Sequence, residues 1–357
     1  MRRYERVSSC GLAVLFLLAV SGQAFAQSSE TPGPVSVSLD EAAKEAAGFS
    51  RLHSLLVSWK GELLLERYFN GVRPARLANI KSASKSVISA LVGVAIGRGL
   101  IGGVDTPISS FFPELLGPDT DPRKQQITIE DLLTMRSGLE TTSNRNYGAW
   151  VQSSNWVRHA LSRDLVAPPR SRMVYSTGNT HLLSAILTKV SGESTWEFAQ
   201  EALAEPLGFT LAHWPRDPQG IYFGGNDMEW TPRQMLAFGE LYLNEGRQDG
   251  KQIIPAEWVR ASQVPRTRSR FGSDRFYSYG WWIREMAGER VFYAWGYGGQ
   301  FVFVVPDLDL VVVTTSSVVP GRERRGHLGS IYDLVEEFII PPIASAERHT
   351  PQLDSVD

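Results

Sequence analysis

Apolar residues near the start of the chain form two short runs, residues 52–59 and 62–68, on either side of Lys60-Gly61. Two such runs separated by turn residues predict a β-hairpin. Residues 82–98 follow, with apolar side chains on nearly every face of a helix. This pattern predicts a helix buried on all sides, and Gly99 supplies the usual C-terminal stop.

The chain between residues 100 and 245 has helical patterns separated by long loops. Thr128 precedes an acidic first turn and Thr231 precedes a proline, and both arrangements mark the start of a helix. Residues 179–190 and 194–204 predict two further helices between these points. This block therefore predicts an all-helical insertion.

Strand patterns return after Arg275. The predicted strands are residues 277–284, 290–294, 301–305 and 310–316, and the predicted closing helix is residues 331–340, ended by Pro341-Pro342. This order predicts an α+β fold, in which an antiparallel sheet built from both ends of the chain is flanked by helices. The expected parts are a discontinuous sheet domain of residues 37–85 and 245–342, a helical domain of residues 86–244, and a polar tail of residues 343–357.

Residues 1–26 have the three parts of a removable export signal. They are a basic start with Arg2, Arg3 and Arg6, an apolar run from Leu12 to Val20, and the small-x-small site Ala24-Phe25-Ala26. The apolar run is too short to span a bilayer, so we expect cleavage before Gln27 and an exported protein, periplasmic or secreted, with no stable membrane anchor. An uncleaved anchor and a twin-arginine export route stay open as alternatives. Residues 27–36, rich in Ser, Pro and Gly, predict a flexible start of the mature chain.

The composition is that of an ordinary globular protein, with 43% hydrophobic and 21% charged residues and a formal net charge of −2. This charge gives no electrostatic basis for binding nucleic acid. The one cysteine, Cys10, lies inside the predicted signal, so the mature chain has no thiol nucleophile, disulfide or thiolate metal site. The six histidines are scattered without ligand spacing, and we expect neither a metal site nor a cofactor.

The strongest candidate for chemistry is Ser82-Ala83-Ser84-Lys85, at the start of the apolar helix. Residues three apart on a helix share a face, so Lys85 lies beside Ser82. A serine hydroxyl needs a base to take its proton, and a lysine amine serves when burial lowers its pKa. The ordinary alternative to a catalytic pair is a serine that caps the helix, followed by a lysine on the surface. This helix is apolar on nearly every face, which makes it a poor place for a lysine without a function.

Five segments in order resemble the β-lactamase-related serine hydrolases, the family of class C β-lactamases, D-amino-acid peptidases and related esterases. They are residues 81–85, residues 131–139 (Asp-Leu-Leu-Thr-Met-Arg-Ser-Gly-Leu), residues 174–179 (Val-Tyr-Ser-Thr-Gly-Asn), residues 230–233 (Trp-Thr-Pro-Arg) and residues 295–300 (Trp-Gly-Tyr-Gly-Gly-Gln). The similarity runs from about residue 50 to residue 342 and implies the family's β-lactamase or penicillin-binding transpeptidase fold. The third and fifth segments look most like the subgroup named for 6-aminohexanoate-dimer hydrolase.

The resemblance implies further site residues. Tyr175 matches the tyrosine of the family's Tyr-x-Asn motif, and a tyrosine relays a proton when a nearby ammonium lowers its phenol pKa. The backbone N–H groups of Ser82 and Tyr297 would form the oxyanion hole. Thr177 stands where the family often has asparagine, and we expect it to bind substrate.

The sequence departs from the family where a Lys-Thr-Gly or His-Thr-Gly strand is usual, because it reads Ala294-Trp295-Gly296. We expect Trp295 and Gly296 to bind substrate, with the glycine allowing close approach to the backbone. The loss of the cationic and hydroxyl residues argues against efficient β-lactam turnover. Trp295 instead suggests an apolar ester or amide substrate.

The sequence therefore predicts an exported serine hydrolase that cleaves a small ester or amide through an acyl-enzyme on Ser82, with Lys85 and Tyr175 as the other catalytic residues. Two alternatives remain: a β-lactamase or D-amino-acid peptidase that acts on cell-wall-type substrates, and a non-catalytic binding module that kept the fold. The oligomeric state, the acyl group and the leaving group are not encoded in any motif.

Overall fold

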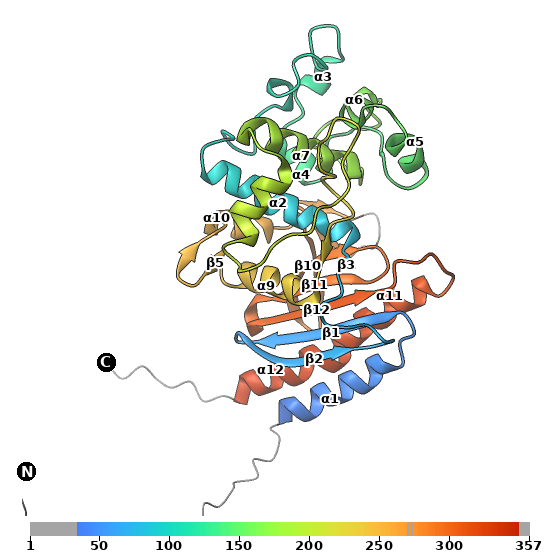
Figure 1. Cartoon of the computed structure of the whole chain (residues 1–357), viewed down its shortest axis with the longest axis vertical. Coiled ribbons are helices and arrows are strands. Elements are labelled where there is room, and N and C mark those ends of the chain that lie inside the picture. The colour runs from blue at the N-terminus through green and yellow to red at the C-terminus, as the bar shows by residue number, and fades with distance from the viewer. Residues whose placement is uncertain (1–33, 270–271, 273, 350–357) are drawn as a thin grey trace, which may run out of the picture.

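The computed structural model describes residues 34–269, 272 and 274–349. Its core is an eight-stranded antiparallel sheet in the order β2-β1-β12-β11-β10-β9-β8-β7. The strands are β1 (Leu52–Trp59), β2 (Glu62–Tyr68), β7 (Thr267–Arg268), β8 (Phe276–Tyr277), β9 (Trp282–Met286), β10 (Glu289–Gly296), β11 (Gln300–Val305) and β12 (Leu310–Ser316). Because β1 pairs with β12, the two ends of the chain build one sheet, as the sequence predicted (Figure 1).

Helices cover both faces of this sheet. One face carries α1 (Pro34–Ala47) and a continuous helical run of α11 (Arg324–Asp333), the π-helical turn η6 (Leu334–Ile339) and α12 (Ile340–His349). The other face carries α9 (Pro232–Leu243), which packs on β1, β11 and β12. Gly239 allows this contact, because a Cβ there would lie 2.5 Å from a Val311 methyl group. α9 lies in the segment that the sequence analysis assigned to the helical domain.

The strands β11 and β12 are apolar at nearly every position because both of their faces are buried. Phe301 and Phe303 point to the cluster formed with the C-terminal helices, whereas Val302 and Val304 point to the cluster that contains α9. Successive side chains of a strand face opposite ways, so one strand supplies both layers.

The helical part lies on the α9 side of the sheet, around α2 (Ser84–Gly97) (Figure 1). Its other helices are α3 (Pro122–Gln125), α4 (Ile129–Leu133), α5 (Tyr147–Val151), α6 (Trp156–Ser162), α7 (Thr177–Ser191), α8 (Thr195–Ala199) with the π-helical η4 (Gln200–Ala204), and α10 (Ala256–Ser262). The described residues also form single 3₁₀ turns, which are η1 (Lys81–Ala83), η2 (Ile108–Ser110), η3 (Asn144–Asn146) and η5 (Pro306–Leu308). Two small two-stranded sheets pair β3 (Ala78–Asn79) with β4 (Glu229–Trp230) and β5 (Arg247–Gln248) with β6 (Lys251–Gln252). Every residue of α2 from Ser84 to Ala95 is buried, so the prediction of a helix enclosed on all sides is confirmed.

The predicted helix starts at Thr128 and Thr231 are also confirmed. Thr128 forms a capping box with Asp131, and Thr231 forms one with Gln234. Each pair satisfies two backbone N–H donors at a helix end.

The predicted strand 277–284 is wrong, because β8 and β9 are separated by a turn around Gly280. Gly280 has a φ of 78°, and its carbonyl accepts a hydrogen bond from Ser86 at 2.7 Å. A Cβ at this position would lie 2.8 Å from the carbonyl oxygen of Lys85. The strand therefore breaks where it meets the buried helix.

The prediction that Pro341-Pro342 ends the last helix is wrong. The amide of Ile340 bonds to the carbonyl of Val335, five residues back, and this wide turn passes the chain into α12 with the two prolines at its start. The predicted polar tail is accordingly wrong for residues 343–349, of which Ile343 and Ala344 are buried. Residues 350–357 lie outside the described part of the chain.

At the other end, α1 was not predicted. Its buried positions are Leu39, Ala42 and Ala46, and two small alanines give a weak apolar signal. Residues 34–36 were expected to be flexible and are helical, while the predicted signal, residues 1–26, lies outside the described residues. In the described part of the chain, no helix is both long enough and apolar enough to cross a bilayer.

Ile343 provides a test of the C-terminal helix. Ile343→Ala removes a fully buried side chain from the cluster that contains Leu39 of α1. We expect the free energy of unfolding to fall by about 2–5 kcal/mol, measured by chemical denaturation. Arg348→Ala, on an exposed residue of the same helix, should change it by less than about 0.5 kcal/mol. Equal stability of the two variants would contradict the packing of α12.

Candidate active site

Ser82 and Lys85 lie together where the 3₁₀ turn η1 runs into α2. The Lys85 side chain is buried, with 1% of the residue exposed, and its Nζ donates to Ser82 Oγ at 3.1 Å. Nζ also donates to the carbonyl oxygen of Gly225 at 2.6 Å. The amine therefore has two partners, one on the candidate nucleophile and one on the backbone of a distant loop.

Burial lowers the pKa of Lys85 to about 7, and the charge of Asp227 opposes this shift. Asp227 is itself engaged, because its Oδ1 accepts from Lys81 Nζ at 2.6 Å and from Asn79 Nδ2 at 2.8 Å. The negative charge of Asp227 is thus offset by another cation. A large fraction of Lys85 is a neutral amine near neutral pH, as a general base requires.

The ring of Tyr175 also lies beside the amine, with its centroid 5.2 Å from Lys85 Nζ. The ring stacks on Trp282 at 5.9 Å and meets Tyr277 edge-on at 6.4 Å. Burial raises the pKa of Tyr175 to about 12, and a hydrogen bond with Ser82 opposes this shift. The lowered phenol pKa that a proton relay requires is therefore absent, because the effect of burial outweighs that of the hydrogen bond with Ser82.

A pocket of about 720 Å³ opens onto Ser82. It is lined by Ser82, Asn144, Tyr175, Trp282, Trp295, Tyr297, Arg324, Arg325 and Leu328. Aromatic rings form much of its wall, with Trp295 edge-on to Trp282 at 5.5 Å and stacked on Phe301 at 6.1 Å. The pocket can hold a small molecule with its reacting bond at the Ser82 hydroxyl.

The two residues expected to supply the oxyanion donors line the same pocket. Tyr297 follows directly after β10 and lines the same pocket as Ser82. The Ser82 amide belongs to the first turn of the η1–α2 run, where N–H groups have no carbonyl one turn earlier in the helix. This arrangement can place two N–H groups beside one carbonyl oxygen.

Two of the expected substrate-binding residues are not among the pocket-lining residues. The Thr177 hydroxyl is buried and forms a hydrogen bond with Ser143 Oγ at 2.9 Å. A Cβ on Gly296 would overlap the carbonyl oxygen of Ile80, so this glycine lets β10 approach the segment that carries Ser82. The close approach that requires glycine is thus made by the protein's own backbone.

Asn144, Trp282, Arg324, Arg325 and Leu328 line the pocket but were missed in the sequence analysis. Arg324 lies over the ring of Tyr297, with its guanidinium carbon 4.4 Å from the ring centroid. Both arginines belong to a cluster of arginines after the last strand, which was the one sequence signal available for this wall. They place positive charge in a pocket whose neighbouring strand has lost the family's cationic residue.

Among the described residues, no three His, Cys, Asp or Glu side chains are grouped as a metal site would require. The side-chain groups that bond to Ser82 are the amine of Lys85 and the phenol of Tyr175. This set fits nucleophilic attack on a carbonyl carbon with proton transfer to and from the amine.

Comparison with known proteins identifies the relatives of this chain. The family described as beta-lactamase matches residues 51–335. The 6-aminohexanoate-dimer hydrolase of Paenarthrobacter ureafaciens is 24% identical over 307 residues, which are 77% of this chain and 74% of that protein.

Two solved structures share the fold. The class C beta-lactamase of Rhodobacter sphaeroides has a TM-score of 0.62 at 17% identity, over 85% of this chain and 98% of that one. EstCE1, a hydrolase with promiscuous acyltransferase activity, has a TM-score of 0.66 at 18% identity, over 84% of this chain and 98% of that one. With the family match extending over most of its length, this chain belongs to the beta-lactamase family of serine hydrolases.

Proposed function

We propose that this protein is an exported hydrolase that cleaves an ester or amide bond through an acyl-enzyme on Ser82. The observation that carries the proposal is the buried amine of Lys85, 3.1 Å from Ser82 Oγ and with a pKa lowered to about 7. The family match supports the reaction class. Export is proposed from residues 1–26 alone.

In the first half of the reaction, the neutral amine of Lys85 takes the Ser82 proton as Oγ attacks the substrate carbonyl carbon. The N–H groups of Ser82 and Tyr297 hold the resulting oxyanion. The ammonium then returns its proton to the leaving group, and the acyl group stays on Ser82. In the second half, Lys85 takes a proton from water as the water oxygen attacks the acyl ester. The ammonium then returns this proton to Ser82 Oγ as the ester C–O bond breaks, which releases the acid and restores the free serine and the neutral amine.

Tyr175 has a different task in this scheme. With a pKa of about 12, its phenol stays protonated throughout the neutral range. It can donate a hydrogen bond to Ser82 Oγ or to the departing group, and thereby guide the proton between Lys85 and the leaving group.

Arg324 and Arg325 narrow the class of substrate that we propose. The departures at Ala294 and Trp295 argue for an apolar substrate, but Ala294 is buried and two arginines reach the pocket from α11. We infer a substrate with an apolar body and a negatively charged end. β-Lactams and D-amino-acid peptides carry such a carboxylate, so these arginines also favour the second candidate, a β-lactamase or D-peptidase.

The nucleophile is tested with Ser82→Ala. We expect the variant to lose hydrolysis of p-nitrophenyl esters and covalent labelling by a fluorophosphonate probe, because no other hydroxyl replaces the attacking oxygen. Ser89→Ala is the matched control, since Ser89 is a fully buried serine of the same helix. Absence of labelling in the folded wild type would instead support a non-catalytic binding module.

The base is tested by the pH dependence of kcat/KM. Only the neutral amine accepts a proton, so kcat/KM should rise about tenfold per pH unit below pH 7 and level off above it. Lys85→Ala should lower the rate by about 10²–10⁴-fold. Tyr175→Phe should be slower but keep the rise near pH 7. A profile that falls through pH 7 would contradict the assignment of Lys85.

The arginines are tested with two esters of equal acyl length, p-nitrophenyl valerate and the p-nitrophenyl monoester of glutarate. Arg324→Ala should lower kcat/KM for the charged ester by about 10–100-fold, which corresponds to a lost charge-assisted contact of about 1.5–3 kcal/mol. The neutral ester should change by less than about threefold, and exposed Arg322→Ala should change neither. Equal losses for both esters would contradict a charge-reading role, and nitrocefin turnover would identify the lactamase candidate.

A further inference from the structure

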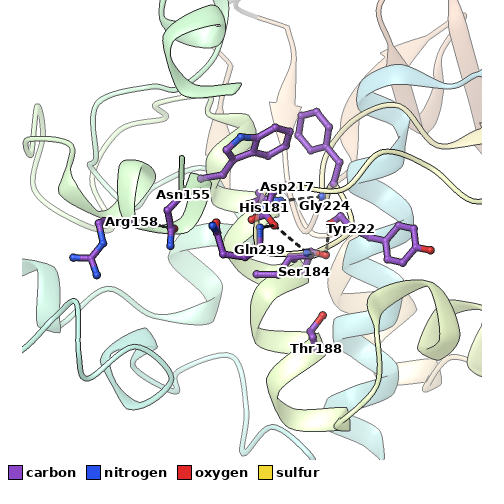
Figure 2. Close-up of polar contacts among 12 residues, drawn as sticks. Asn155, Arg158, His181, Ser184, Thr188, Asp217, Gln219, Tyr222 and Gly224 are labelled. Atoms are coloured by element: carbon purple, nitrogen blue, oxygen red, sulfur yellow. Dashed lines mark hydrogen bonds and ion pairs between the residues drawn. The ribbon is translucent and has the colours of Figure 1, made fainter. Parts of the chain in front are cut away.

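A buried histidine–carboxylate pair lies in the helical part, outside the pocket (Figure 2). His181 Nε2 is 3.0 Å from Asp217 Oδ2, and neither side chain is exposed. A buried carboxylate is costly unless its oxygens are hydrogen-bonded, and neither residue has a part in the reaction proposed above. The contacts of the pair indicate what it holds.

Asp217 organises the loop that carries Gly225. Its Oδ1 accepts from the backbone amides of Gln219 at 2.8 Å and Ile221 at 2.9 Å. Together with the contact to His181, these bonds satisfy both carboxylate oxygens. We name residues 214–228 the Gly225 loop, and Asp217 fixes its first turn.

His181 joins that first turn to the far end of the loop. The amide of Gly224 lies 3.4 Å from His181 Nδ1. A backbone N–H only donates, so Nδ1 is the acceptor and the ring proton is on Nε2, where it donates to Asp217. One imidazole therefore bridges Asp217 and Gly224.

The end of the loop is pressed against α7. Ser184, on the same helix, donates to the carbonyl of Tyr222 at 2.7 Å. A Cβ at Gly224 would overlap the carbonyl oxygen of Thr180, and one at Gly225 would overlap the Thr180 hydroxyl. The backbone at Gly224 and Gly225 thus has little freedom to move toward α7, and its Gly225 carbonyl holds Lys85 Nζ at 2.6 Å.

This contact matters for a neutral lysine. A neutral amine has two N–H groups and one lone pair, so fixing one N–H on Gly225 limits the directions in which the lone pair can point. The lone pair must face Ser82 for the proton transfer. We propose that His181 and Asp217 are positioning residues for Lys85, acting through the backbone of Gly224 and Gly225, an inference that rests on the proposed function.

The other charged or titratable groups near the amine do not duplicate this role. Tyr175 lies over it from the segment before α7, and Asp227 acts on it by charge while paired with Lys81. None of these contacts involves His181 or Asp217. Loosening the Gly225 loop should therefore change the direction and hydration of the amine while leaving the neighbouring charges in place.

The variants are Asp217→Asn and His181→Gln. Asparagine has the shape of aspartate but presents an NH₂ group either to His181 Nε2–H or to the two loop amides, so one donor always faces another. Leu187→Ala is the matched control, because Leu187 is a fully buried residue of α7 whose truncation destabilises the helix but whose apolar side chain makes none of the hydrogen bonds that hold the loop. Ser184→Ala is the mildest variant, since it removes one hydroxyl that holds the loop.

The readout is the second-order rate of fluorophosphonate labelling of Ser82 from pH 5.5 to 9.5, with the melting temperature measured in parallel. We expect Asp217→Asn and His181→Gln to lower the labelling rate at pH 7 by about tenfold or more. The midpoint of the pH dependence of this rate should move upward by at least half a pH unit, because water reaches the amine and favours its charged form. Ser184→Ala should shift both in the same direction by a smaller amount. Leu187→Ala should lower the melting temperature with an unchanged midpoint.

Wild-type rates and midpoints in folded Asp217→Asn and His181→Gln would overturn the proposal. If those two variants do not fold, the test rests on Ser184→Ala. A wild-type labelling rate and a wild-type midpoint in that variant would equally overturn the proposal. Labelled wild type with unaffected variants refutes the positioning role alone. Unlabelled, folded wild type refutes the proposed function and the positioning role with it.

Discussion

The site depends on keeping water away from one amine. Lys85 lies in the first turn of α2, a helix buried from Ser84 to Ala95, and this burial is the main reason that its pKa falls to about 7. The central position of α2, between the sheet and the other helices, is therefore part of the chemistry as well as of the packing. A lysine on the surface of the same helix would stay an ammonium and could not accept a proton.

Excluding water from this site requires backbone segments to pack closely together. Glycines occur at the positions where these segments meet. Gly280 approaches the carbonyl of Lys85, Gly296 approaches that of Ile80, and Gly225 packs on Thr180 of α7. At each of these positions a Cβ would lie within 2.8 Å of a protein atom. The sheet is thus pressed against the start of α2, while the Gly225 loop is pressed against α7 and reaches α2 through its hydrogen bond with Lys85. Ser82 remains at the pocket.

Local signals explain what could be predicted from the sequence. The hairpin around Lys60, the capping residues Thr128 and Thr231 and the apolar faces of α2 depend on neighbours in the chain, and each was found. The pocket wall at Arg324, the turn at Gly280 and the passage of the last helix through Pro341 depend on partners far away in the sequence. The helix α1 was not predicted for another reason. It buries Ala42 and Ala46, and two alanines give a weaker hydrophobic pattern than larger apolar side chains would.

Burial acts on Lys85 and Tyr175 in opposite directions, since it disfavours an ammonium and a phenolate alike. The pKa of the lysine falls to about 7 and that of the tyrosine rises to about 12, so at and above neutral pH a large fraction of the pair is uncharged. Attack by Ser82 then creates an ammonium and an oxyanion together, as neighbours in a medium of low dielectric, where their attraction is strong. The same desolvation that makes the amine basic enough to act therefore also favours the charge separation of the transition state, provided that the amides of Ser82 and Tyr297 are already in place.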